Sequence, residues 1–201
     1  SLSVGSATIT AALGSTPAEG EISFTALAAP TEAPPTPDKP AGDVISIFSD
    51  QYTDATIDSY SPEWDGADLA EFDIDGNNIL LYTNVTYAAI VFETAVINAT
   101  SMDYLHVDVW VPASVPVVGI KLIDYGADGE FGGGDDSEKE LFMTPGSVPA
   151  LTPGSWSSLD IPLDDFMGTG GLDARATLAQ LYFTGSGITI FADNIYFYRI
   201  P

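Results

Sequence analysis

The chain has 201 residues, with 29 acidic residues against five basic ones and a formal net charge of −24 at pH 7. This charge disfavours binding to nucleic acid or to an anionic membrane, and it favours a soluble monomer. Cysteine is absent and histidine occurs once, which excludes disulfides, thiolate metal sites and multi-histidine centres within the chain. Hydrophobic residues make up 45% of the sequence, enough for a packed core. No apolar run reaches the ~18 to 20 residues of a membrane span, so we expect no membrane insertion.

The N-terminal part differs in composition from the rest. Residues 6–13 and 20–27 alternate like two short strands around a Gly-Ser-Thr-Pro turn. Two strands cannot bury a core alone, so we interpret residues 1–27 as the remnant hairpin of a preceding immunoglobulin-like domain. Residues 28–43, AAPTEAPPTPDKPAGD, are rich in proline, which favours extended, solvated backbone. This composition predicts a linker at 28–43 and a main domain at 44–201.

From Val44 onward the hydrophobic pattern has period 2, with Gly, Pro, Asn and Asp at intervals of about 8 to 12 residues. Helical periodicity is limited to one turn near residues 163–167. The pattern predicts an all-β chain folded as an antiparallel β-sandwich of the jelly-roll type. The predicted strands are residues 44–48, 69–74, 79–83, 88–93, 104–111, 117–124, 139–143, 156–161, 178–184 and 188–198.

Strand alternation separates a core face from an outer face. It places residues 105, 107 and 109 in the core, and turns residues 104, 106, 108, 110, 121, 180, 182 and 184 outward. A row of rings and polar groups suits sugars, which stack on aromatic faces and need placed hydrogen-bonding partners. Rings also fit pleated, half-buried surfaces, so simple packing is the alternative. The candidate ligand-binding residues are Trp64 in a polar loop together with Tyr82, His106, Asp108, Trp110 and Lys121.

Two groups of carboxylates are candidates for calcium, which takes six to eight oxygen ligands at irregular geometry. The glycine-rich loop at residues 124–138 contains Asp124, Asp128 and Asp135. The second group pairs Asp193 with the neighbourhood of Asp50 and Asp54. A solvated acidic turn is the alternative for the first group, and turn or strand-end capping for the second.

Several motifs resemble carbohydrate-binding modules with a galactose-binding-domain-like jelly roll. TIFADNIYFY (189–198) and GSWSSLDIPL (154–163) carry the general likeness. VISIFSD (44–50), EWD (63–65), HVDVW (106–110) and KLIDYGADGEFGGGDDSE (121–138) are similar to a module attached to secreted bacterial glycoside hydrolases, laminarinases among them. The resemblance covers residues 43–198. It implies a non-catalytic sandwich outside the cell, tethered beside enzymes or on a cell surface, with Asp193 as a structural calcium ligand.

The sequence therefore predicts a module that binds a neutral polysaccharide, with a β-1,3-glucan such as laminarin as the expected ligand. An anionic polymer would be repelled by a chain with so few cations. A structural spacer or cell-surface interaction domain without glycan binding is the alternative. An enzyme is not expected, because no motif selects a carboxylate pair from 29 acidic residues and no Gly-x-Ser-x-Gly elbow is present.

Overall fold

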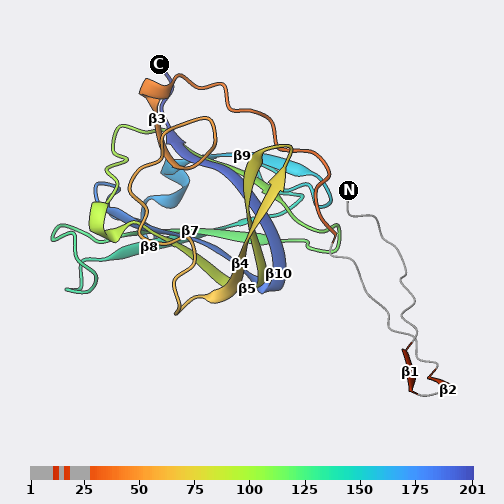
Figure 1. Ribbon diagram of the computed structural model, residues 1–201. Coiled ribbons are helices and arrows are strands. Elements are labelled where there is room, and N and C mark those ends of the chain that lie inside the picture. The colour runs from red at the N-terminus through yellow and green to blue at the C-terminus, as the bar shows by residue number, and fades with distance from the viewer. Residues whose placement is uncertain (1–10, 14–15, 19–27) are drawn as a thin grey trace.

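The computed structural model describes residues 11–13, 16–18 and 28–201. Its main domain is built almost entirely from strands, as predicted (Figure 1). Short 3-10 helices lie at η1 (Ala41–Asp43), η2 (Glu93–Ala95) and η3 (Leu163–Phe166), and none of the described helices is long and apolar enough to cross a membrane. The strands are β3 (Val44–Phe48), β4 (Gly66–Ile74), β5 (Asn77–Val91), β6 (Tyr104–Trp110), β7 (Val118–Asp124), β8 (Ser137–Met143), β9 (Trp156–Pro162) and β10 (Leu178–Tyr198).

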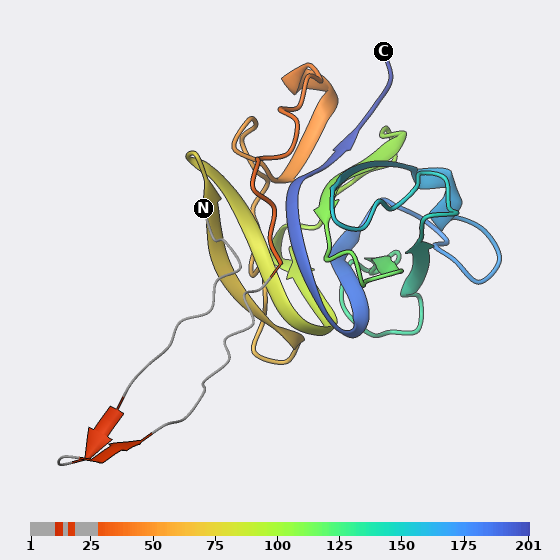
Figure 2. The same ribbon diagram turned by 90° about the vertical axis from the view of Figure 1, so that its right-hand side faces the viewer.

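The long strand β10 belongs to both layers of an antiparallel β-sandwich. Its first part pairs with β5 and β7, and β7 pairs with β8, which forms the first layer. Its second part pairs with β5, β3 and β6, and β6 pairs with β9, which forms the second layer. Strand β4 pairs with β5 and ends the sheet on that side. Figure 2 shows β10 as a blue ribbon running through the whole body.

A break in the pairing register marks the change between the layers. The register of β10 against β5 shifts between Thr184 and Ile188. Gly187 has φ +71°, a backbone conformation that residues other than glycine rarely adopt. Asn84 on β5 also has a positive φ, of +56°. Bulges of this kind bend a strand and increase its twist, so one strand can turn from the first layer into the second.

The core fills the space between the layers. Leu105, Val107 and Val109 of β6 are fully buried in it, as the alternation predicted. They join a cluster that contains Leu181 and Phe183 from the first part of β10. Burial of such side chains contributes ~1.5 to 3 kcal/mol each, so this cluster is the main source of the sandwich's stability.

In two places, two predicted strands that follow each other in the sequence belong to one continuous strand of the structure. Predicted strand 79–83 and residues 88–91 of predicted strand 88–93 lie in β5, which ends at Val91, and predicted strands 178–184 and 188–198 both lie in β10. The residues between them interrupt the alternation, and the pairing passes from Thr184 with Tyr87 directly to Ile188 with Val85, so an irregularity absorbs the unequal lengths of the two strands. The remaining predicted strands of the main domain correspond to β3, β4, β6, β7, β8 and β9.

The N-terminal prediction is corrected in part. Strands β1 (Ala11–Leu13) and β2 (Thr16–Ala18) form a two-stranded antiparallel sheet. Strand β2 therefore contains the Thr16 and Pro17 that the sequence assigned to a turn. The predicted strand at residues 20–27 lies outside the described residues.

The proline-rich segment 28–40, which we call the strap, lies against the second layer rather than in solvent. Pro30 and Pro34 are buried. The Trp156 indole N–H donates to the Glu32 carbonyl (2.7 Å), and the Tyr52 hydroxyl donates to the Lys39 carbonyl (2.9 Å). In Figure 2 the strap is the red-orange line that runs along the sheet toward β3. The prediction of a solvated linker is therefore wrong for these residues, because their rings and carbonyls find partners on the sheet.

Candidate functional site

The outer side of the first layer carries a partly exposed cluster of aromatic and polar side chains, of which only Gln180 is buried, and we call it the open face. Its residues come from the four strands of this layer, β5, β10, β7 and β8, and from the loop before β4. Trp64, Tyr87 and Phe142 expose 51%, 39% and 59% of their surface, respectively. The members of the open face are Trp64, Tyr87, Lys121, Glu138, Glu140, Phe142, Gln180, Tyr182 and Thr184.

Strand register explains why these residues share one face. Tyr182 on β10 is opposite Lys121 on β7, which in turn is opposite Glu140 on β8. In the next row Tyr87 is opposite Thr184, which is opposite Gly119, and Gly119 is opposite Phe142. Neighbouring strands are ~4.8 Å apart, so this second row spans about 14 Å.

Gly119 has no side chain, so the middle of the open face is a depression between its neighbours. A Cβ at this position would lie 2.1 Å from Thr184 Oγ1 and 2.5 Å from Glu140 Oε1. Without it, the Thr184 hydroxyl donates a hydrogen bond to Glu140 across β7. Two polar groups therefore occupy the floor between the Tyr87 and Phe142 rings.

Three aromatic rings meet at one side of the open face. The Trp64 and Tyr182 centroids lie 6.3 Å apart, and the Tyr87 and Tyr182 centroids lie 6.4 Å apart. The Tyr87 hydroxyl donates to the Trp64 carbonyl at 2.9 Å, and the Ala89 N–H donates to Asp65. These bonds hold the loop of Trp64 against β5, so the indole is presented at a fixed place beside the two tyrosines.

The polar groups of the open face form a connected chain of hydrogen bonds. The Tyr182 hydroxyl donates to Gln180 (2.6 Å), the Gln180 amide donates to the Tyr125 hydroxyl (2.7 Å), and Tyr125 donates to Glu93 (2.7 Å). Burial, with the nearby charge of Glu138, raises the pKa of Tyr182 to about 12. The hydroxyl therefore stays protonated at neutral pH and can act as a donor.

Lys121 supplies a cation at the centre of the open face. Its Nζ lies 5.1 Å from the centroid of the Tyr182 ring and 3.2 Å from Glu138 Oε2. The ring and the carboxylate together hold the long side chain close to the sheet. Lys121 and Trp64 are the two predicted ligand residues that lie on the open face, and both lie beside the Tyr182 ring.

Sequence reasoning missed Tyr87 and Phe142 as candidates. Tyr87 lies in β5 between two predicted strands. The alternation of neither strand therefore assigned its side chain to a face of the sheet. Phe142 lies on β8, where Glu138 and Glu140 precede it on the same side. In β8 three charged residues are followed by three apolar ones, so the strand has no alternation that would have singled out Phe142.

The predicted row of His106, Asp108 and Trp110 lies on the outer side of the second layer, which we call the covered face. The alternation prediction is correct, but the row is not open. His106 is 8% exposed, Asp108 is 1% exposed and Trp110 is 7% exposed. The strap and the neighbouring strands cover it, so these three residues do not present an open surface for a polysaccharide.

Tyr82 points into the core and is fully buried. Its hydroxyl donates to the Tyr60 carbonyl at 2.6 Å, and its ring lies 6.0 Å from that of Phe183. The neighbouring Leu81 packs against the cluster of Trp110 and Phe191 on the covered face. Both sides of the second layer are thus apolar here. Alternation between apolar and polar residues therefore cannot show which side of β5 faces the core.

A hydrogen-bond network fills the centre of the covered face. The Asn194 amide donates to Asp108 Oδ2 (2.8 Å) and to the Pro35 carbonyl of the strap (3.3 Å), and Asn194 accepts from the Ser49 hydroxyl. Ser158 donates its hydroxyl hydrogen to Asp108 at 2.5 Å. Asn194 has φ +48°, which places its side chain where it can serve all these partners.

His106 lies between two carboxylates in this network. Its Nδ1 is 2.8 Å from Asp160 Oδ1, its Nε2 is 3.5 Å from Asp108 Oδ1, and its ring stacks on Tyr196 with a centroid distance of 4.6 Å. Burial lowers the pKa of His106, but the hydrogen bonds and charges of Asp108 and Asp160 outweigh it and raise the pKa to about 9. The imidazole is therefore charged at neutral pH.

The predicted calcium ligands do not gather into one cage. Within the part of the chain that the structure describes, no three acidic or histidine side chains come together as a cation site. Asp193 accepts the Asn77 amide on one oxygen and the Asn194 N–H on the other, both at 2.6 Å. Burial raises the pKa of Asp193 to about 6, although these hydrogen bonds lower it. Its carboxylate is thus engaged by N–H donors, which does not fit an open cation ligand.

The other predicted ligands are likewise engaged with protein donors. Asp50 accepts from the backbone and side chain of Asn78, and Asp54 accepts from Ser46. The remaining three, in the loop at 124–138, accept backbone N–H groups: Asp124 from Gly126 and Thr177, Asp128 from Glu130, and Asp135 from Ala127 and Asp128. Calcium binding stays a prediction.

The fold is similar to that of β-sandwich carbohydrate-binding modules. No family model and no curated protein sequence matches the chain. Among solved structures, the chain is similar to the family 30 carbohydrate-binding module of a cellulosomal cellulase from Clostridium thermocellum. The TM-score is 0.57 at 13% identity, over 78% of this chain and 97% of that one.

Two further structures give the same result. A second family 30 module matches with a TM-score of 0.55 and 15% identity, over 78% of this chain and 99% of the other. The family 11 module of another cellulosomal cellulase from Clostridium thermocellum matches with a TM-score of 0.50 and 15% identity, over 78% and 95% of the two chains. At these identities the likeness establishes the fold.

We expect Trp110→Ala to destabilise the sandwich by ~3 to 5 kcal/mol, because it removes a buried ring from the covered face. The Trp110 ring meets Phe191 edge-on at 5.4 Å and packs near Trp156. Urea unfolding followed by circular dichroism measures the loss. A variant as stable as the wild type would show that the covered face is not packed as described.

The raised pKa of His106 predicts that stability falls at alkaline pH. The charged ring contributes fully below its unfolded pKa of about 6.5, and this contribution is lost as the pH rises through about 9. We expect a loss on the order of 2 to 3 kcal/mol in the free energy of unfolding between pH 6 and pH 10. His106→Gln should lose less over the same range. If the free energy of unfolding depends on pH equally in the wild type and in His106→Gln, the alkaline loss of stability does not come from His106.

Calcium binding is tested by thermal unfolding of demetallated protein with calcium and with chelator. A cation that binds only the folded chain stabilises it by ~2.7 kcal/mol at a hundredfold excess over Kd, so the melting temperature must rise. Asp193→Asn removes the charge and should abolish the rise if calcium binds there. Coincident melting curves for the wild type would exclude a structural calcium ion.

Proposed function

We propose that this chain is a non-catalytic polysaccharide-binding module and that the open face is its binding site. The carrying observation is the partly exposed group of Trp64, Tyr87 and Tyr182, with a hydrogen-bonded polar network beside it. Sugar rings bind through apolar contact of their CH faces with aromatic rings and through hydrogen bonds to their hydroxyls. Both kinds of group are held in place here before any ligand arrives, which lowers the cost of ordering them on binding.

The fold supports this proposal by analogy. The similar structures are carbohydrate-binding modules, and two of them are parts of cellulosomal cellulases. A shared sandwich does not fix the ligand, since one fold serves many functions. The proposal therefore rests on the residues of the open face, and the similarity of fold is supporting evidence.

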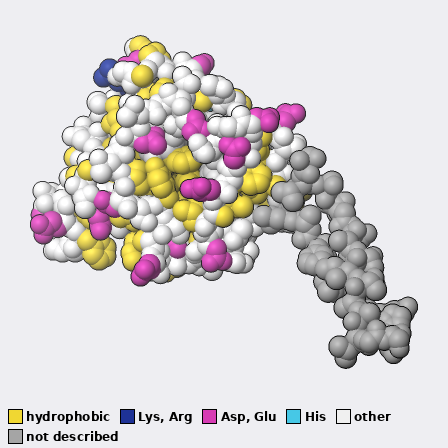
Figure 3. All heavy atoms as spheres, viewed as in Figure 1, with side chains coloured by type: hydrophobic (Ala, Val, Ile, Leu, Met, Phe, Trp, Pro, Cys, Tyr) yellow, Lys and Arg dark blue, Asp and Glu magenta, His cyan; other side chains and the backbone are white. Residues whose placement is uncertain are grey.

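The expected ligand is a neutral β-glucan, with the β-1,3-glucan laminarin as the first candidate. The chain carries 29 acidic residues, and the two glutamates beside Lys121 make the open face itself acidic. Figure 3 shows acidic side chains spread over the side of the molecule in view, with hydrophobic surface between them. Sulfated or uronic polymers would be repelled, whereas uncharged hydroxyls can use the same carboxylates as acceptors.

The module would act by holding an attached enzyme or a cell-surface system on its polysaccharide. Such a role places it outside the cell, beside a glycoside hydrolase or surface-protein domain of a longer chain. It requires binding without bond cleavage, so reducing sugar should not accumulate when the protein is incubated with its ligand. Release of reducing sugar would contradict the non-catalytic assignment.

The proposal predicts that Trp64→Ala and Tyr182→Ala each weaken laminarin binding by about thirtyfold or more, as expected for central aromatic contacts. Affinity electrophoresis and calorimetry provide the measurement, with mixed-linkage glucan and cellulose oligomers as parallel ligands. Leu69→Ala is the matched control, because it removes an exposed apolar side chain on β4 in the other layer.

The outcomes separate the alternatives. Loss of binding to a different glucan in the aromatic variants would keep the open face and change the ligand. Unchanged binding in both variants would move the site elsewhere. No binding of the wild type to any polysaccharide would favour a structural spacer.

A further inference from the structure

The covered face has the features of a groove that recognises a proline-rich chain. Its rows contain Trp110 with Trp156, His106 with Tyr196, and Tyr104 with Tyr198. The last pair stacks with centroids 5.1 Å apart. Aromatic rows of this kind receive the rings and methylenes of extended proline-rich segments in several peptide-binding domains.

The strap meets this groove as a proline-rich ligand would. A polyproline II chain has three residues per turn and no internal hydrogen bonds, so its carbonyls are free for side-chain donors. The carbonyls of Glu32 and Pro35, three residues apart in the strap, accept from Trp156 (2.7 Å) and Asn194 (3.3 Å). Pro40 has φ −59° and ψ 132°, which lies in the polyproline II region.

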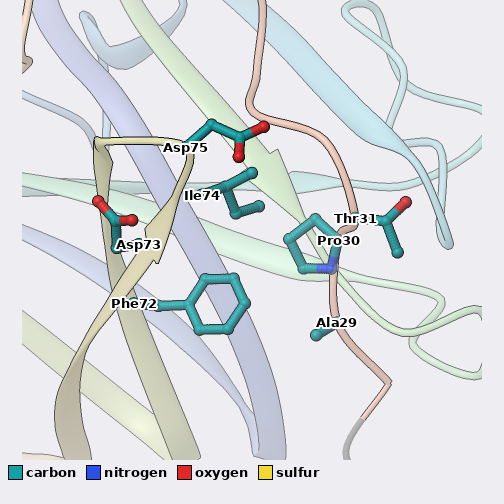
Figure 4. Close-up of a pocket in the computed structure, with 7 residues that line it drawn as sticks. All are labelled: Ala29, Pro30, Thr31, Phe72, Asp73, Ile74 and Asp75. Carbon is teal, nitrogen blue, oxygen red and sulfur yellow. The ribbon is translucent and has the colours of Figure 1, made fainter. Parts of the chain in front are cut away.

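Both ends of the strap are fixed by further contacts. At its end near β3, Lys39 Nζ lies 5.0 Å over the Tyr198 ring, and the Lys39 carbonyl accepts from Tyr52. At its start, Ala29 packs against the cluster of Ile79, Trp110 and Phe191, and beside it Pro30 faces Phe72 and Ile74 of β4 across a cavity of about 410 Å³ (Figure 4). A second cavity of about 210 Å³ remains between the strap and the row of His106 and Tyr196.

We propose that the covered face is a recognition groove for a proline-rich segment, which residues 28–40 fill within their own chain, and that it accepts the same segment from a second copy. The strap is held by hydrogen bonds from side chains of the sheet to its carbonyls and by Lys39 over the Tyr198 ring, and its residues Pro30 and Pro34 are buried. These contacts therefore do not depend on covalent continuity between the strap and β3. This interaction lies outside the proposed polysaccharide site, which is in the other layer.

The proposal is tested on the full chain with a protease site inserted between Ala41 and Gly42, both of which are exposed. A Cβ at Gly42 would meet no other atom within 4 Å, so there is room for the insertion. After cleavage of the folded protein, we expect the N-terminal fragment to co-elute with the sandwich in gel filtration. Added fluorescent peptide of residues 28–41 should then exchange into the groove, as measured by anisotropy.

A control peptide of the same length and charge, with alanine in place of every proline, should bind at least tenfold more weakly. Trp156→Phe keeps an aromatic ring, although a smaller one, and removes the indole N–H, so the loss of this hydrogen bond should weaken the authentic peptide about threefold to tenfold. Release of the fragment on cleavage without rebinding of the peptide would overturn the proposal. Equal binding of the two peptides would overturn the recognition of proline.

A second measurement does not depend on the insertion. In the uncleaved wild type, the Glu32 carbonyl is held by Trp156, so glutamate-specific proteolysis after residue 32 should be slow. We expect Trp156→Phe to speed this cleavage at least threefold without changing cleavage after the exposed Glu71 on β4. Equal rates at Glu32 in the two proteins would show that the groove does not hold the strap.

Discussion

The structure depends on the pairing of one strand with strands of both layers. Strand β10 pairs with β3, β5, β6 and β7, and the three remaining strands of the sandwich, β4, β8 and β9, are each one strand away. Its register therefore sets the register of the whole sandwich. A slip of one residue in β10 would exchange Leu181 and Phe183 in the core for Gln180, Tyr182 and Thr184, which the buried interior could not accept. The same constraint that builds the core thus places Tyr182 on the open face.

The two outer faces have similar chemistry but different partners. Each carries aromatic rings with hydrogen-bonding groups between them. On the covered face the strap occupies the rings, and its carbonyls accept from Trp156, Asn194 and Tyr52. On the open face the polar groups bond one another, as from Tyr182 to Gln180, and leave ring surface exposed. A face of this composition is stable when its polar groups are satisfied, whether by a bound segment or by its own network.

The sequence predicted the layers well because alternation is a local property of a strand. It placed Leu105, Val107 and Val109 in the core, and the structure confirms this. It could not predict that His106 and Trp110 are covered, because the covering residues are more than 60 positions away and their proline content is equally typical of a free linker. Tyr82 was misplaced for a related reason: once the strap buries the outer side, both sides of β5 are apolar and period 2 loses its contrast.

Electrostatics limits what the open face can bind. Four of the five cations are in ion pairs with carboxylates, namely Lys39, Lys121, Arg175 and Arg199. The only one of these on the open face, Lys121, is paired with Glu138, so the face offers little net attraction to an anion. Repulsion from the remaining acids is screened beyond ~8 Å at physiological ionic strength, but a bound anionic polymer would lie closer than that. For the proposed polysaccharide ligand, affinity must then come from ring contact and hydrogen bonds, which an uncharged chain of sugars can supply.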